Sequence, residues 1–182
     1  NLTARNKKFT MTSLIQGFYR SSSNLMIPDT IRVYLRNAFS PFALLDSSKA
    51  YTDSTGTSVY RFNNLSINDG VPFLIQVKHR NSVETWSSYS AASPVHSDNS
   101  FSPLNSTAAY DFSTAQSKAF GSNQIQVDNL PVNKFALYGG DVDQEGNIDL
   151  TDVLTVYNDA SNFTNGYVNT DVTGEKLTDL TD

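Results

Sequence analysis

A twelve-residue segment rich in oxygen-bearing side chains occurs twice in this sequence, and it limits the available folds more than any other feature. Residues 141–152 read Asp-Val-Asp-Gln-Glu-Gly-Asn-Ile-Asp-Leu-Thr-Asp, and residues 171–182 match them at seven of twelve positions, thirty residues later. Calcium prefers about six to eight hard oxygen ligands, and a loop of this length supplies them from positions 1, 3, 5, 7, 9 and 12. The repeat therefore predicts two calcium-binding loops, called here loop 1 (141–152) and loop 2 (171–182).

Loop 1 has an oxygen ligand at every required position. The predicted ligands are Asp141, Asp143, Glu145, the carbonyl oxygen of Asn147, Asp149 through a water molecule, and Asp152. Gly146 stands at position 6, where the loop turns sharply and a side chain is poorly tolerated. Ile148 at position 8 is expected to enter the core and fix the loop. Five acids this close repel one another without a cation, so a bound Ca2+ is favoured over an acidic turn that only caps a helix.

Loop 2 keeps fewer of these features. Its predicted ligands are Asp171, Thr173, Glu175, Asp179 and Asp182. Lys176 replaces the glycine at position 6, Thr178 replaces the apolar residue at position 8, and Gly174 is expected to move the turn two residues earlier. We therefore expect a weaker second Ca2+ site. The helix expected after position 12 is missing, so this repeat is predicted to be truncated.

The charge distribution follows the same division of the chain. Residues 1–140 carry 12 Lys or Arg against 8 Asp or Glu, whereas residues 141–182 carry 10 acids and only Lys176. A tail this acidic is either a solvated, disordered segment or a cation site. The regular spacing of its acids favours the cation site.

Residues 1–138 have the pattern of a β domain. Apolar residues alternate with polar ones around Ile31–Leu35, Phe73–Val77 and Ile125–Val127, which is the period of half-buried strands. Turn-forming Ser, Asn, Asp and Gly clusters separate these segments, so we expect an antiparallel β-sandwich of immunoglobulin-like or jelly-roll type. After Gly139-Gly140 the period changes: four apolar residues from Leu150 to Tyr157 have helical spacing and predict a helix with a buried stripe.

The loop-plus-helix unit, with a strand-like segment before it, resembles a dockerin type I repeat. The resemblance covers residues 139–182 and implies a calcium-binding appendage in which the acids of both loops are ligands. It also implies that Leu150-Thr151 and Leu180-Thr181, at positions 10 and 11, contact a cohesin-like partner; burial of both leucines is the simpler expectation. The β region followed by Phe135–Asp141 is similar to surface and secreted proteins of Bacteroidota-like bacteria.

Other functional classes have little support. The sequence has no cysteine, no phosphate-binding loop and no hydrolase or metalloprotease motif. His79 continues an apolar strand face, so a core or rim position is expected. Trp86 with Tyr89 offers a sugar-stacking platform, although packing is the simpler explanation. Basic residues are dispersed and no apolar run has the length of a membrane span, so we expect neither nucleic-acid binding nor membrane insertion.

The sequence thus predicts a β-sandwich domain at 1–138 and a dockerin-like calcium-binding pair at 139–182. The expected role is a non-enzymatic, extracellular structural module of a bacterial surface assembly or filament, with glycosylation at the four Asn-x-Ser/Thr sequons as a further expectation. Head-to-tail strand exchange through residues 9–19 is predicted, with an intramolecular first strand as the equal alternative. The other candidate is a binding module, either a dockerin-type tether to a cohesin-like partner or a carbohydrate-binding sandwich.

Overall fold

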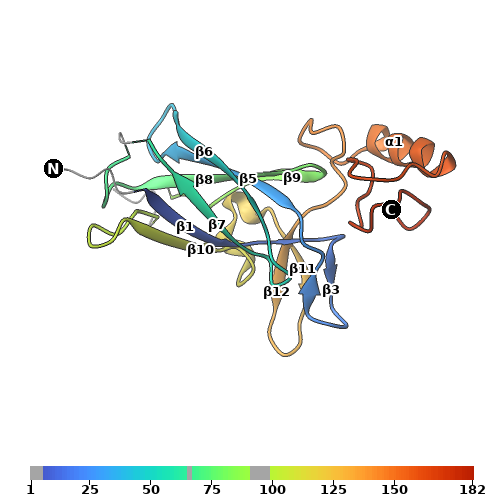
Figure 1. Ribbon diagram of the computed structural model, residues 1–182, viewed down its shortest axis with the longest axis horizontal. Helices are drawn as coiled ribbons and strands as arrows, with labels where there is room; N and C mark the ends of the chain where they lie inside the picture. Colours follow the sequence, from blue (N-terminus) through green and yellow to red (C-terminus); the bar gives the residue numbers. More distant parts are fainter. Residues whose placement is uncertain (1–5, 65–66, 91–98) are drawn as a thin grey trace.

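The computed structural model describes residues 6–64, 67–90 and 99–182. The described residues are mainly β, with several sheets and one α-helix (Figure 1). Within the described residues, the helix does not have the length and apolar character needed to cross a membrane. The sequon at Asn1 and the residue His96 lie outside the described residues.

The largest sheet has four antiparallel strands in the order β6-β5-β8-β9. These strands are β5 (Thr30–Asn37), β6 (Leu44–Tyr51), β8 (Phe73–His79) and β9 (Ser82–Trp86). The predicted alternation is confirmed in β5, where Ile31, Val33 and Leu35 are buried. In β8, Leu74 and Gln76 on the opposite face are buried as well, so both faces of this central strand are covered.

The remaining strands form smaller sheets in the orders β10-β1-β7, β11-β12-β2 and β3-β4. Their bounds are β1 (Lys7–Thr12), β2 (Leu14–Ile15), β3 (Tyr19–Arg20), β4 (Leu25–Met26), β7 (Thr57–Phe62), β10 (Thr107–Asp111), β11 (Ile125–Asp128) and β12 (Lys134–Leu137). Two pairings, β1–β10 and β2–β12, are parallel, so these sheets are mixed and not wholly antiparallel. Two short 3-10 helices, Gln116–Lys118 and Phe120–Ser122, lie between β10 and β11.

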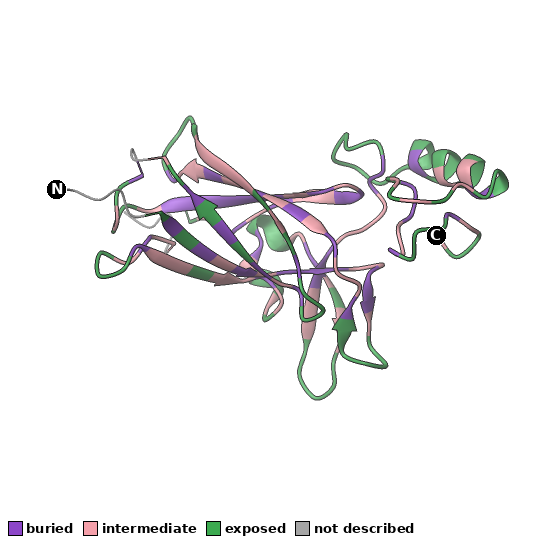
Figure 2. Ribbon diagram, viewed as in Figure 1, coloured by how far each residue is buried: buried purple, intermediate pink, exposed green. Residues whose placement is uncertain are grey.

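One hydrophobic core joins the strands of the separate sheets. It includes Phe9 and Met11 of β1 together with Phe73 of β8, and the rings of Phe9 and Phe73 meet edge-on with centroids 6.3 Å apart. Leu14 and Ile15 of β2 and Leu137 of β12 belong to the same cluster. The core ends at β12, and the residues that follow, 139–182, called here the C-terminal unit, lie at one end of the molecule (Figures 1 and 2).

The predicted helix is present as α1 (Leu150–Ser161). It begins at Asp149, whose side chain accepts a hydrogen bond from the Thr151 N–H, and Asp152 completes a capping box. The predicted burial of its apolar stripe is wrong: Leu150, Val153, Leu154 and Tyr157 are all exposed (Figure 2). Of the residues of α1, only Asp152 and Ala160 are buried.

Candidate metal centre

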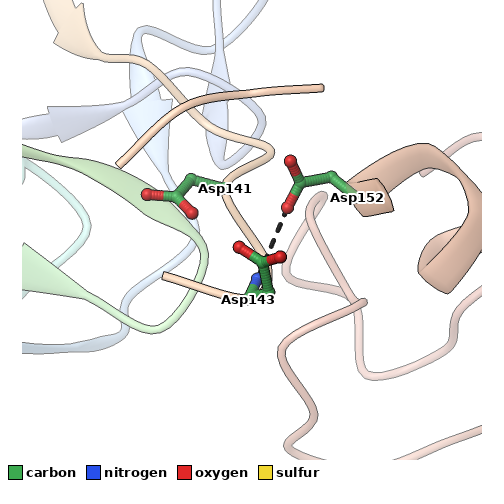
Figure 3. Close-up of side chains that lie close together, drawn as sticks. All are labelled: Asp141, Asp143 and Asp152. Carbon is green, nitrogen blue, oxygen red and sulfur yellow. Dashed lines mark hydrogen bonds between the residues drawn. The ribbon is translucent and has the colours of Figure 1, made fainter. Parts of the chain in front are cut away.

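Three carboxylates of loop 1 lie close together. One oxygen each from Asp141, Asp143 and Asp152 falls within 4.8 Å of the others, a spacing that suits a shared metal ion (Figure 3). Asp141 and Asp143 follow β12 in the chain, and Asp152 lies in the first turn of α1. The loop between β12 and α1 brings the three side chains together. The structure thus gathers positions 1, 3 and 12 of the predicted loop.

Backbone hydrogen bonds hold this arrangement. Asp152 accepts at Oδ1 from the N–H of Asp143 at 3.4 Å, the dashed line in Figure 3. It also accepts at Oδ1 from the N–H of Val142 (2.8 Å) and at Oδ2 from the N–H of Asp149 (2.9 Å). Asp141 accepts at Oδ2 from the N–H of Gly146 at 3.2 Å. The first and last residues of the loop therefore fix its path through their side chains.

The second carboxylate oxygen of Asp141, Oδ1, lies in an unfavourable environment. Asp141 is only 1% exposed, and its Oδ1 is buried with no hydrogen-bond partner within the described part of the chain. Burial raises the pKa of Asp141, and the neighbouring charges of Asp152 and Asp143 raise it further, whereas the nearby backbone N–H groups of Gly146 and Gln144 oppose this rise. A buried carboxylate oxygen without a partner is costly, and a bound cation would remove that cost.

The other predicted ligands of loop 1 lie outside this cluster. Asp149 accepts at Oδ1 from the N–H of Thr151 at 2.7 Å, which is a helix-capping contact. Glu145 is exposed and accepts from the side-chain amide of Asn147 at 3.1 Å. The ligand roles of Glu145, Asn147 and Asp149 remain predictions.

Loop 2 gathers a different set of acids. Oxygens of Glu175, Asp179 and Asp182 lie within 4.8 Å of one another. The hydroxyl of Thr173 borders this cluster, because it donates to Asp182 Oδ1 at 2.9 Å. Asp171 is not in the cluster, since its Oδ2 pairs with Arg80 at 2.9 Å.

The two loops nevertheless share one backbone conformation. Positions 4 and 6 have positive φ in both, with values of 64° and 98° at Gln144 and Gly146, and 84° and 67° at Gly174 and Lys176. The expectation that Gly174 moves the turn is therefore wrong, because the lysine at position 6 adopts the same left-handed conformation as Gly146. The capping contacts also repeat, since the Asp179 N–H donates to Asp182 Oδ2 at 2.9 Å.

The apolar residues of the unit are placed differently from the prediction. Ile148 is 47% exposed and does not enter the core, and its side chain lies beside Gly140. Leu150 and Leu180 are 69% and 89% exposed, so the expected burial of both is also wrong. An open groove of about 450 Å3 lies between α1 and loop 2, lined partly by Val153, Tyr157 and Leu180. In loop 2 it is Thr178, at position 8, that is buried.

Sequence reasoning missed a buried polar group beside loop 2. Asp29 lies 3.2 Å from His79 Nε2 and accepts hydrogen bonds from Arg80 (3.0 Å) and Tyr167 (2.6 Å). Burial alone would raise the pKa of Asp29, but the close contact with His79 and the hydrogen bond from Tyr167 outweigh it and lower the pKa. His79 is buried as predicted, and that burial lowers its pKa. No sequence spacing links residues this far apart.

The predicted sugar platform is an aromatic pocket of about 440 Å3. Its lining comprises Phe42, Leu74, Trp86, Ser87, Tyr89 and Phe120. The ring of Tyr89 meets those of Phe42 and Phe120 edge-on. The indole N–H of Trp86 donates to Glu84 at 2.6 Å, so this polar group is already used within the fold.

Comparison of the chain with protein-family models, with curated protein sequences and with solved structures gave no match.

Proposed function

We propose that loop 1 binds one Ca2+ ion and that this ion stabilises the C-terminal unit of a non-enzymatic structural module. The observation that carries the proposal is the buried, unpartnered Oδ1 of Asp141 beside the carboxylates of Asp143 and Asp152. An acidic turn that only caps a helix gives no reason to bury a carboxylate oxygen without a hydrogen-bond partner. The cation would occupy the space that these three carboxylates share.

Calcium fits this donor set better than other metals. The clustered donors are carboxylate oxygens, which suit hard cations, and the sequence has no cysteine to favour zinc or copper. The loop lies on the surface, with residues 143–149 all exposed, so carbonyl oxygens and water can complete the coordination. Such flexible coordination is easier for Ca2+ than for Mg2+, which requires near-ideal octahedral geometry.

The finer architecture belongs to the same proposal. The shared core between the four-stranded sheet and the β1 sheet supports a β-sandwich of immunoglobulin-like or jelly-roll type. The common backbone and caps of the two loops support a dockerin-like repeat pair at 139–182. We further propose that the protein lies outside the cell, at a bacterial surface, where millimolar Ca2+ would keep such a loop filled.

Thermal and urea melts with calcium and with chelator test the site. At calcium about 100-fold above the dissociation constant, binding should add about 2.7 kcal/mol to the free energy of unfolding. Asp141→Asn should remove most of this gain. Asp53→Asn is the matched control, because Asp53 is an exposed carboxylate in the turn between β6 and β7, outside the C-terminal unit. Identical melts with calcium and chelator would refute the proposal.

A second candidate function is attachment to a protein partner, favoured by the exposed apolar side chains of α1 and loop 2. Leu150 and Leu180 occupy the positions that contact a cohesin in the family resembled. Binding of the calcium-loaded protein to an immobilised cohesin should weaken in Leu150→Ser and Leu180→Ser, whereas Leu130→Ser, exposed in the β region, should have no effect. Equal binding by all three variants would reject this surface.

Self-association into filaments remains a proposal for the assembled state. In the single chain, β1 pairs with both β7 and β10, so an exchanged strand from a neighbour would have to replace β1 in that position. Electron microscopy and light scattering at high concentration with calcium measure assembly directly. A monomer under these conditions would exclude it.

A further inference from the structure

Arg80 lies in the two-residue turn between β8 and β9, where the β region meets the C-terminal unit. Its side chain is only 8% exposed. Nε donates to Asp29 Oδ2 at 3.0 Å, Nη2 donates to Asp171 Oδ2 at 2.9 Å, and Nη1 donates to the Val168 carbonyl. One guanidinium therefore links two buried carboxylates, one from each part of the molecule.

Aromatic rings fix the guanidinium on its other sides. The Arg80 Cζ atom lies 5.2 Å from the ring centroid of Phe18 and 4.7 Å from that of Tyr167. Cation–π contacts at these distances are favourable, particularly where water is excluded. The charge is thus held in one place by residues of both the β region and the C-terminal unit.

Asp171 is the position-1 counterpart of Asp141, yet its surroundings differ. Both oxygens of Asp171 are used: Oδ1 accepts from the Gly174 N–H (2.8 Å), and Oδ2 accepts from the Lys176 N–H (3.1 Å) and from Arg80. The contact from position 6 to Oδ2 repeats the one from Gly146 to Asp141. The difference lies in the buried cation: Arg80 binds Asp171 at Oδ2, whereas within the described residues no cationic side chain pairs with Asp141, whose Oδ1 has no partner.

We propose that Arg80 serves as the resident cation of loop 2, so that calcium fills this loop only when Arg80 is displaced from Asp171. Loop 2 then acts as a joint that fastens the C-terminal unit to the β region. The inference rests on the proposed calcium site of loop 1, because it assumes that the position-1 aspartate of each loop binds a cation. That cation is Ca2+ at Asp141 and the Arg80 guanidinium at Asp171. Calcium loading of loop 2 and docking through Arg80 are mutually exclusive.

Other contacts keep the joint closed when Arg80 is changed. The side-chain amide of Asn81 donates to the carbonyls of Asn169 (3.0 Å) and Asp171 (2.8 Å). Gly174 packs against the ring of Phe18 so closely that an added Cβ would lie 2.5 Å from it. An Arg80→Gln variant is therefore expected to stay folded and docked.

Calorimetric titration with CaCl2 tests the proposal. The wild type should bind one ion tightly. Arg80→Gln should bind two, with affinity at loop 2 at least about tenfold above that of the wild type, since freeing a buried carboxylate is worth more than one factor of ten. Adding Asp182→Asn to Arg80→Gln should remove the second ion. Arg80→Lys, which keeps the charge, should bind one ion.

The outcomes separate the two hypotheses. A folded wild type that binds no calcium would reject the proposed function, whereas a wild type and Arg80→Gln that each bind one ion would reject only the role of Arg80. If the variant does not fold, the Arg80 Nε–H resonance of the wild type decides by NMR. That resonance should be unchanged by the first equivalent of calcium and lost as a second ion binds. Its loss at the first equivalent, or its persistence with two ions bound, would overturn the proposal.

Discussion

Loops 1 and 2 share seven of twelve residues and the same backbone turns, but they face different surroundings. Loop 1 is exposed from residue 143 to 149, and only its ends are buried. In loop 2, Asp171, Gly174 and Thr178 are buried, two of them against Arg80 and Phe18 of the β region. On the proposals made above, we infer that the surroundings of such a loop decide whether it holds an ion or joins two parts of a protein.

The largest effect should come from replacing the position-1 aspartate of each loop. Asp171→Asn leaves a buried arginine without one of its two carboxylates and should cost about 3 kcal/mol of unfolding free energy, with or without calcium. Asp141→Asn should leave the calcium-free protein as stable as the wild type or slightly more stable, because it removes a buried charge among like charges. Urea melts of both variants in calcium and in chelator measure this. Equal, calcium-dependent losses in both would abolish the distinction between the loops.

Glycine to alanine substitutions probe the backbone that the loops share. At Gly174, the new Cβ would meet the ring of Phe18 at 2.5 Å, in addition to the strain of φ at 84°. We expect a loss of about 2–4 kcal/mol from clash and strain together. At Gly146, φ is 98° but nothing lies within 4 Å of the added atom, so strain of about 1–2 kcal/mol is the whole cost. Thermal melts in chelator that rank the two variants the other way would contradict this account.

The joint at loop 2 should also make stability depend on pH. Burial lowers the pKa of His79 in the folded state, so folding is favoured above the unfolded pKa of about 6.5 and this contribution is lost as the pH falls. Asp29, whose pKa is lowered as well, loses its contribution below about pH 4. Because one group binds at most one proton, it can change the free energy of unfolding by at most about 1.4 kcal/mol per pH unit. Urea melts from pH 8 to 5 should show a smaller slope in His79→Gln than in the wild type; an equal slope would assign it to other groups.

The smallest effect concerns the lysine at position 6 of loop 2. Lys176→Gly should relieve left-handed strain of about 1–2 kcal/mol, offset by about 0.4–1 kcal/mol from the freer unfolded chain. A net gain of about 1 kcal/mol or less is expected in thermal melts. Gln144→Gly is the matched change in loop 1 and should give no gain, because the side chain of Gln144 donates to the carbonyl of Asp141 at 2.8 Å. A gain in Gln144→Gly that equals that of Lys176→Gly would show that this hydrogen bond contributes nothing.

The sequence predicted the local features well. Alternation located β5 and β8, and the spacing of acids located a cluster containing Asp141, Asp143 and Asp152. It did not predict that Asp171 pairs with Arg80, because the two residues are 91 positions apart and only the fold brings them together. It also did not predict that the apolar stripe of α1 is exposed, since periodicity identifies an apolar face but does not say whether another surface covers it.

The position of β1 has a consequence for how the chain acquires its structure. β1 pairs in parallel with β10, so Phe9 lies beside Ala108, and Leu14 of β2 lies beside Ala136. These contacts have high contact order, and the entropy of closing such long loops slows folding. During synthesis from the N-terminus, one edge of β1 can pair with β7, but its other edge has to wait for β10, which is made about a hundred residues later. A nascent chain of this protein therefore keeps one strand edge of β1 unpaired, the kind of edge that holdase chaperones recognise, until β10 has been made.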